Sequence, residues 1–183
     1  MTGNRLSLLL LAALAVASNG VRSDEFRVEV PRQIDGRLPN EQYAHAFGCT
    51  GGNVSPLVRW SGVPAGTQSF VVTMYDPDAP TGSGWWHWTV ANIPAEVRAL
   101  PAGAGSEPGQ LPVGAVAVRG DAGHASYFGA CPPVGEVHRY EIAVHALKVA
   151  RLDFPPDASP AMVGYLTHLN RLAKAMVIVP GGR

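Results

Sequence analysis

The 183-residue sequence lacks several features that would define its function directly. Charged residues make up 15% of the chain, and 14 acidic residues balance 14 basic ones. This balance argues against a nucleic-acid-binding surface, which requires a basic patch. Neither GxGxxG nor a P-loop occurs, which argues against nucleotide binding, and no GxSxG elbow of a serine hydrolase is present. The two cysteines form no CxxC or Cys/His zinc spacing, so no structural metal or other cofactor is expected.

The chain also has no apolar run long enough to span a bilayer comfortably. Its longest run is residues 6–17, which follows Arg5 and ends in the small-x-small sequence of residues 15–17. This pattern predicts a secretory signal over residues 1–20 and a single domain over residues 24–183, with an uncleaved anchor as the alternative. A periplasmic or secreted protein, with no transmembrane segment in the mature chain, is therefore expected.

Glycine and proline are abundant and separate many short apolar runs, which predicts a β-rich fold. The central pattern is a pair of such runs, residues 69–75 and 86–92, joined by the rigid loop PDAPTGSG. This indicates a β-hairpin, and its geometry brings Asp76 and His87 close together at one edge of the sheet. Strict alternation would place Asp76 on the face of Phe70, Val72 and Met74, and His87 on the face of Thr89, Ala91 and Ile93.

Further strands are predicted at residues 26–30, 57–60, 115–118 and 140–149, and residues 94–114 are expected to be an irregular surface excursion. In the strand at 140–149, alternation extends backwards to His138 and puts it on one face with Tyr140, Ile142 and Val144. The other face, with Arg139, Glu141, Ala143 and His145, is predicted to be largely solvated. His138 thus ends an apolar stripe, as Asp76 and His87 do.

A helix is predicted to begin at Ser159-Pro160, with serine as N-cap and proline as the first helical residue. Apolar residues continue at helical spacing to Met176, which indicates a C-terminal packing helix, and residues 177–179 are predicted as a last short strand. His168 and Arg171 are assigned to the solvent face of this helix.

Three stretches together resemble the phosphatidylethanolamine-binding protein family, in particular its bacterial branch similar to Raf kinase inhibitor protein. They are YDPDAP, GWWHW, and YFGACPPVG followed by HRY, and the resemblance covers about residues 26–176. It implies an antiparallel β-sandwich with a pocket for small anions, such as phosphate groups, at one end of a sheet. The residues that match the family's pocket are Asp76, Asp78, Ala79, Pro80, Trp85, His87, Gly129, Pro132, His138 and Tyr140.

The chain departs from the family pattern at Glu136, where the family often has glycine. An acid there could weaken anion binding, although a side chain directed to solvent is the favoured interpretation. The resemblance places Cys49 and Cys131 in loops near the pocket mouth, and in an exported protein they are expected to form a disulfide.

Two functions therefore remain open. The favoured one is a binding or inhibitor-like protein for a small anion or a phosphorylated ligand, with no protein target indicated. The alternative is an enzyme that uses Asp76, His87 and His138 for acid–base or metal chemistry.

Overall fold

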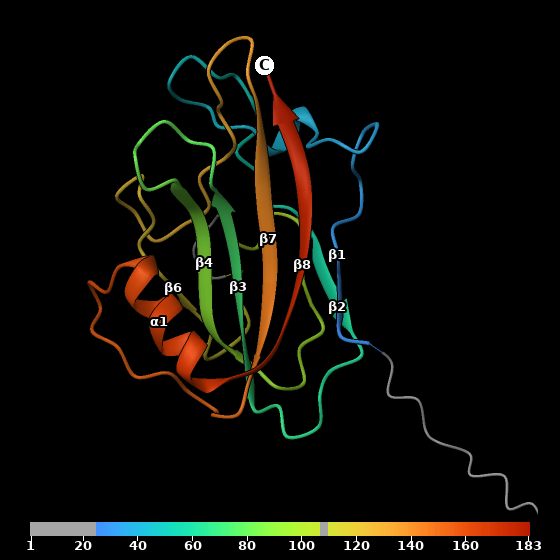
Figure 1. Ribbon diagram of the computed structural model, residues 1–183, viewed down its shortest axis with the longest axis vertical. Coiled ribbons are helices and arrows are strands. Elements are labelled where there is room, and N and C mark those ends of the chain that lie inside the picture. Colours follow the sequence, from blue (N-terminus) through green and yellow to red (C-terminus); the bar gives the residue numbers. More distant parts are fainter. Residues whose placement is uncertain (1–24, 107–109) are drawn as a thin grey trace, which may run out of the picture.

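The computed structural model describes residues 25–106 and 110–183, so the predicted secretory signal lies outside the described residues. The chain forms two antiparallel sheets and one α-helix (Figure 1). The small sheet has the order β1-β2-β5 and the large sheet the order β6-β4-β3-β7-β8. The elements are β1 Arg27–Glu29, the 3-10 helix η1 Asn40–Gln42, β2 Val58–Ser61, β3 Ser69–Asp76, β4 Trp85–Pro94, β5 Ala99–Leu100, β6 Val116–Ala117, β7 Val137–Leu147, α1 Pro160–Asn170 and β8 Arg171–Gly182.

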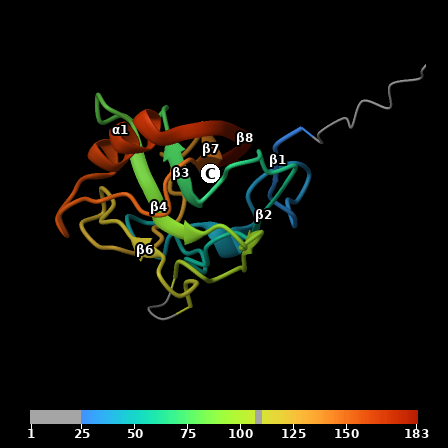
Figure 2. The ribbon, with the colours of Figure 1, turned by 90° about the horizontal axis from the view of Figure 1, so that it is seen from below.

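The large sheet is covered on both faces (Figure 2). On one face, Trp60 of the small sheet packs with Phe70 of β3, at 5.2 Å between ring centroids, in the main core. On the other face, Val163 of α1 packs with Val71 and Leu147. This arrangement confirms the prediction of a mainly β, antiparallel sandwich with a packing helix. No helix among the described residues is long and apolar enough to cross a membrane.

The predicted hairpin is confirmed, but β-bulges interrupt its alternation. Tyr75 pairs with Trp86 and Met74 pairs with Trp88, so His87 is the extra residue between two pairs. A second register shift lies between the pairs Val72–Val90 and Phe70–Ile93, so Ala91 and Ile93 face opposite sides of the sheet and the prediction that His87 shares a face with both is wrong. Ile93 lies in the core between the sheets, whereas Ala91 packs on the helix side. A bulge adds one residue to one strand and so reverses the facing of everything beyond it.

The helix begins as predicted and ends earlier. The Ser159 side chain accepts a hydrogen bond from the Met162 N–H at 3.2 Å, and Pro160 is the first helical residue. The prediction that the helix continues to Met176 is wrong, because β8 starts at Arg171 and pairs with β7 to Gly182. Pairing along the whole of β7 supplies the backbone hydrogen bonds that a longer helix would have made. His168 and Arg171 are exposed, as predicted.

The two faces of β7 are only partly as predicted. His138, Tyr140, Ile142 and Val144 are buried, which confirms the inward face. On the other face Arg139 is exposed, but Ala143 and His145 are buried, so the prediction of a largely solvated face is wrong at that end. The reason is that α1 lies against β4 and β7 there. The region 94–114, predicted to be irregular throughout, contributes the two-residue strand β5 to the small sheet.

Candidate ligand-binding pocket

A cavity of about 270 Å³ is lined by residues at the end of β3 and the beginnings of β4 and β7. These strand ends lie at the top of the large sheet in Figure 1. Six of the predicted site residues line the cavity, and they come from three strands and the loop after β3. The full lining is Phe47, Asp76, Ala79, Pro80, Thr81, Trp85, His87, Phe128, Cys131, Pro133 and His138.

Asp76 is the last residue of β3 and is 3% exposed. Its Oδ2 lies 2.7 Å from His138 Nδ1, and its Oδ1 accepts a hydrogen bond from the Asp78 N–H at 2.9 Å. Burial alone would raise the pKa of this carboxyl group. The neighbouring His87, together with the hydrogen bonds from His138 and Asp78, outweighs burial and lowers the pKa of Asp76 below 3.8. Asp76 is therefore a buried carboxylate that favours a positive charge beside it.

His138 lies between two carboxylates. Its Nδ1 faces Asp76, and its Nε2 lies 3.1 Å from Glu136 Oε2. Carboxylates accept hydrogen bonds, so both ring nitrogens donate only when the ring is protonated. Burial alone would lower the pKa of His138, but the two carboxylates outweigh burial and raise the pKa above 6.5. The preference for Glu136 pointing to solvent is thus wrong, because this half-exposed side chain reaches back to the histidine.

His87 is held by a backbone carbonyl and not by a carboxylate. Its Nδ1 lies 2.8 Å from the carbonyl oxygen of Phe128. A carbonyl oxygen can only accept, so this nitrogen carries the proton and the neutral ring has a bare Nε2. That Nε2 lies 4.0 Å from Asp76 Oδ2, is buried, and has no hydrogen-bond partner among the described residues. It can accept a hydrogen bond from a ligand when the ring is neutral, and donate one when the ring is protonated.

Aromatic rings form much of the wall. The Phe128 ring lies 5.6 Å from Phe47 and 6.3 Å from Trp85, measured between centroids. Phe47 is 72% exposed and stands at the mouth, while Trp85 Nε1 is buried without a hydrogen-bond partner in the described part of the chain. Phe47 and Phe128 were not among the predicted site residues. The sequence feature that could have identified them is their position close to Cys49 and Cys131.

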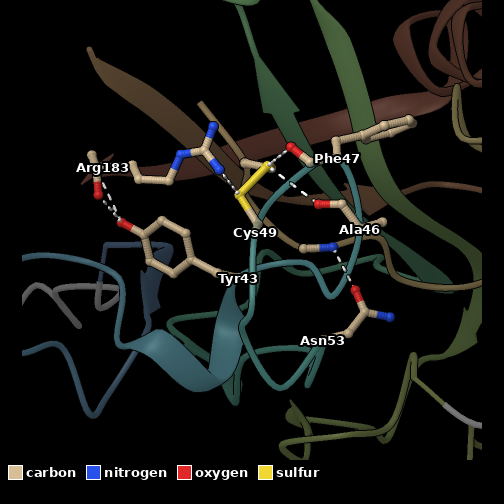
Figure 3. The surroundings of a disulfide bond; sticks show 9 residues. Tyr43, Ala46, Phe47, Cys49, Asn53 and Arg183 are labelled. Carbon is tan, nitrogen blue, oxygen red and sulfur yellow. Dashed lines mark hydrogen bonds between the residues drawn. A yellow bond between two sulfur atoms is a disulfide. The ribbon is translucent and has the colours of Figure 1, made fainter. Parts of the chain in front are cut away.

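The predicted disulfide between Cys49 and Cys131 is confirmed, with the two Cα atoms 5.9 Å apart (Figure 3). Cys131 belongs to the cavity lining, and its sulfur lies 3.6 Å from the carbonyl oxygens of Ala46 and Phe47. The bond therefore ties the Phe47 loop to the loop before β7. It holds one side of the pocket mouth together.

Four predicted site residues do not line the cavity. Asp78 accepts hydrogen bonds from the Arg139 backbone and guanidinium, which lower the pKa of Asp78 to about 2. Tyr140 is fully buried behind the pocket, edge-on to His87 at 5.3 Å between ring centroids. Pro132 is also buried, beside Cys131.

Gly129, the fourth, has a packing role that explains why a glycine stands there. A Cβ at this position would lie 2.3 Å from the Ala44 backbone nitrogen, so any larger residue would force the loops apart. The Gly129 N–H donates to Asn53 Oδ1 at 2.8 Å. Asn53 also donates to the Tyr127 carbonyl at 3.4 Å. Asn53 thus positions the segment whose Phe128 carbonyl orients His87, and its site role was missed in the sequence.

The described residues contain no group of three or more His, Cys, Asp or Glu side chains arranged to hold a metal ion. The chemistry available at the pocket is hydrogen bonding and proton-dependent charge. Two imidazole rings and the Asp76 carboxylate provide it, together with the Glu136 carboxylate that contacts His138.

Fold and pocket together define a β-sandwich domain with a cavity lined by histidine and aspartate at one end of the larger sheet. The sequence profile of the family described as phosphatidylethanolamine-binding protein matches residues 32–180. The chain belongs to this family, which confirms the resemblance recognised in the sequence.

Relatives support the assignment. The UPF0098 protein YbcL of Escherichia coli is 48% identical over 168 residues, covering 91% of this chain and 86% of that protein. The crystal structure of E. coli YbcL, described as a new member of the mammalian PEBP family, matches with a TM-score of 0.83 over 87% of this chain and 99% of that one. The UPF0098 protein YbhB of E. coli is 52% identical over 141 residues, 77% of this chain and 89% of that protein. The putative lipoprotein LppC of Mycobacterium tuberculosis is 38% identical over 114 residues, 62% of this chain and 52% of that protein.

Proposed function

We propose that the protein binds a small anion or the phosphate group of a larger ligand in this pocket, and that it is a binding protein and not an enzyme. The observation that carries the proposal is His87 Nε2, a buried nitrogen in the cavity lining with no hydrogen-bond partner among the described residues. A buried polar atom left without a partner costs about 1–3 kcal/mol, which a bound ligand can recover. Trp85 Nε1 is a second such atom in the same lining.

Charge decides when an anion is attracted. The Asp76 carboxylate contributes one negative charge, and one protonated histidine brings the Asp76–His87–His138 group to neutrality. Protonating the second histidine adds a further positive charge and an N–H donor to the pocket, and this charge offsets the negative charge of Glu136 beside His138. Affinity for an anion is therefore expected to rise as the pH falls through the range in which histidines titrate, near 6.5 for an unperturbed side chain.

The enzyme alternative lacks a comparable observation. Thr81 provides the hydroxyl group in the cavity lining, but this hydroxyl donates to the Gly84 carbonyl within its own loop. It is not paired with His87 or His138, as a nucleophile beside its base would be. The cavity is well suited to hold a ligand and poorly suited to covalent chemistry.

Calorimetric titration with phosphate and, separately, with sulfate at pH 5.5 and 8.0 tests the proposal. Phosphate itself gains a proton over this interval, whereas sulfate remains a dianion, so sulfate isolates the titration of the protein. Both anions should bind about tenfold or more tightly at the lower pH. Absence of binding at both pH values would overturn the proposal.

We also propose export to the periplasm or beyond. The disulfide is a bond typical of oxidising compartments, and one relative is named a lipoprotein. The expected secretory signal over residues 1–20 would direct this export. Intact-mass measurement on protein from the exported fraction should show its removal, and a chain that still starts at Met1 would contradict the predicted cleavage.

A further inference from the structure

Glu136 combines a hydrogen-bonded backbone with a half-exposed side chain. Its N–H donates to the Pro133 carbonyl at 3.1 Å, and its own carbonyl accepts from the Arg183 N–H at 3.3 Å. These bonds hold the turn that precedes β7. The side chain is 55% exposed, and its contact with the pocket is the 3.1 Å approach of Oε2 to His138 Nε2. Rotation about the side-chain bonds can end this contact without moving the backbone.

His138 has just two nitrogens with which to contact a ligand. Nδ1 is committed to Asp76, which is itself buried and held by the Asp78 N–H. Nε2 is the remaining donor, and the Glu136 carboxylate already occupies it. An anion can therefore receive a hydrogen bond from His138 when Glu136 has moved away.

We propose that Glu136 is an internal competitor for the anion site, its carboxylate taking the place of the ligand's anionic oxygen on His138 Nε2. The inference rests on the proposed function of the pocket and adds the residue that sets its affinity. Glu136 opposes the ligand in two ways: it occupies the donor, and its negative charge repels a second anion. Because Glu136 is half exposed, solvent screens its charge, and the expected effect on affinity is moderate.

The other charged or titratable groups near His138 are already engaged or fixed by burial. They are Asp76 on β3, Asp78 in the following loop, His87 on β4, and Arg139 and Tyr140 on β7. Asp78 and Arg139 neutralise each other in a 2.6 Å ion pair, and Asp76 is buried and hydrogen-bonded to both His138 and the Asp78 N–H. Glu136 is the acidic group of this set that can move at little cost.

The test compares Glu136→Gln and Glu136→Ala with the wild-type chain, by calorimetric titration with sulfate at pH 6.0. Glutamine keeps an acceptor and removes the charge, whereas alanine removes both. We expect sulfate to bind about three- to tenfold more tightly to both variants, and at least as tightly to the alanine variant as to the glutamine variant. Glu141→Gln is the matched control, because it makes the same charge change on β7 on the face opposite His138 and should leave the affinity unchanged.

A second readout needs no ligand. In NMR titrations of the histidine rings, Glu136→Gln should lower the pKa of His138 relative to the wild type, and Glu141→Gln should not. Sulfate binding to the wild type with equal or weaker affinity in both Glu136 variants would overturn the competitor role alone. Failure of sulfate to bind any of the proteins would instead overturn the proposed function of the pocket.

Discussion

His138 and His145 lie on the same strand, β7, and both are buried, at 3% and 9% exposure. They differ in what surrounds them. His138 contacts two carboxylates at the pocket end of the sheet, and its pKa is raised. His145 lies on the other face at the helix-covered end, where burial together with the nearby cations Lys174 and Arg171 lowers its pKa to about 3.

The comparison shows that burial by itself does not decide the charge of a histidine. Desolvation lowers the pKa at both positions, and carboxylate partners reverse that effect at one of them. His145 Nδ1 has no hydrogen-bond partner among the described residues, which is consistent with a neutral ring that serves packing. Carboxylates at the pocket end thus favour a protonated histidine, and the helix-covered end favours a neutral one.

The pocket end and the helix-covered end of the large sheet are also stabilised differently. Removing the disulfide should show this difference most strongly. Cys49 and Cys131 are 82 residues apart in the chain. In the chain-entropy model, replacing both by serine should lower the free energy of unfolding by about 4–5 kcal/mol, measured by urea denaturation. Amide exchange should accelerate in the loops around both cysteines and stay unchanged in α1. Uniform acceleration would mean that the pocket end has no separate stability.

Replacing Asp76 by asparagine should make His138 resemble His145. The asparagine carbonyl can accept from the Asp78 N–H, which leaves its amide facing His138 Nδ1 and favours a neutral ring. We expect a loss of about 2–3 kcal/mol in the free energy of unfolding. The loss should be largest between about pH 4 and 6.5.

The pKa shifts of Asp76 and His138 together set the pH range of this stability loss. Asp76 has a lowered pKa, so its contribution is present above 3.8 and fades as the pH falls through its folded value. His138 has a raised pKa, so its contribution is complete below 6.5 and fades as the pH rises through its folded value. A stability difference that does not change with pH would contradict the ion pair.

Replacing His138 by alanine should weaken phosphate or sulfate binding about ten- to a hundredfold, because a charge-assisted hydrogen bond of roughly 1.5–3 kcal/mol is lost. His168→Ala, on the exposed face of α1, is the control and should bind as the wild type does. Calorimetric titration measures both. Equal affinities for His138→Ala and the wild type would place the anion elsewhere.

Replacing His145 by leucine should make the free energy of unfolding less sensitive to acid and leave anion binding unchanged. Because the pKa of His145 is lowered to about 3, the unfolded chain binds this proton more readily between pH 6.5 and 3. Wild-type stability should therefore fall as the pH drops through that interval, with about 2 kcal/mol of the loss by pH 4.5 due to His145. Denaturation curves of the leucine variant at pH 6.5 and 4.5 should lack this contribution; an unchanged pH slope would argue that His145 is protonated in the folded protein.

Local patterns in the sequence determined much of this architecture. The turn-rich loop between two apolar runs was sufficient to predict the hairpin of β3 and β4, because turn residues and apolar runs act over a few residues. Ser159 and Pro160 predicted the start of α1 for the same reason, since a cap is a local interaction. The motifs around Asp76, His87 and His138 identified the correct family and six of the cavity-lining residues.

The tertiary structure decided what local pattern could not. The apolar spacing of residues 172–176 suits a helix, yet the backbone partners that β7 offers made this segment the strand β8. The bulge at His87, the burial of His145 under α1 and the reach of Glu136 to His138 all depend on residues distant in sequence. Hydrogen-bond pairing and solvent exclusion between such segments are energies of the assembled fold, and no short window of sequence contains them.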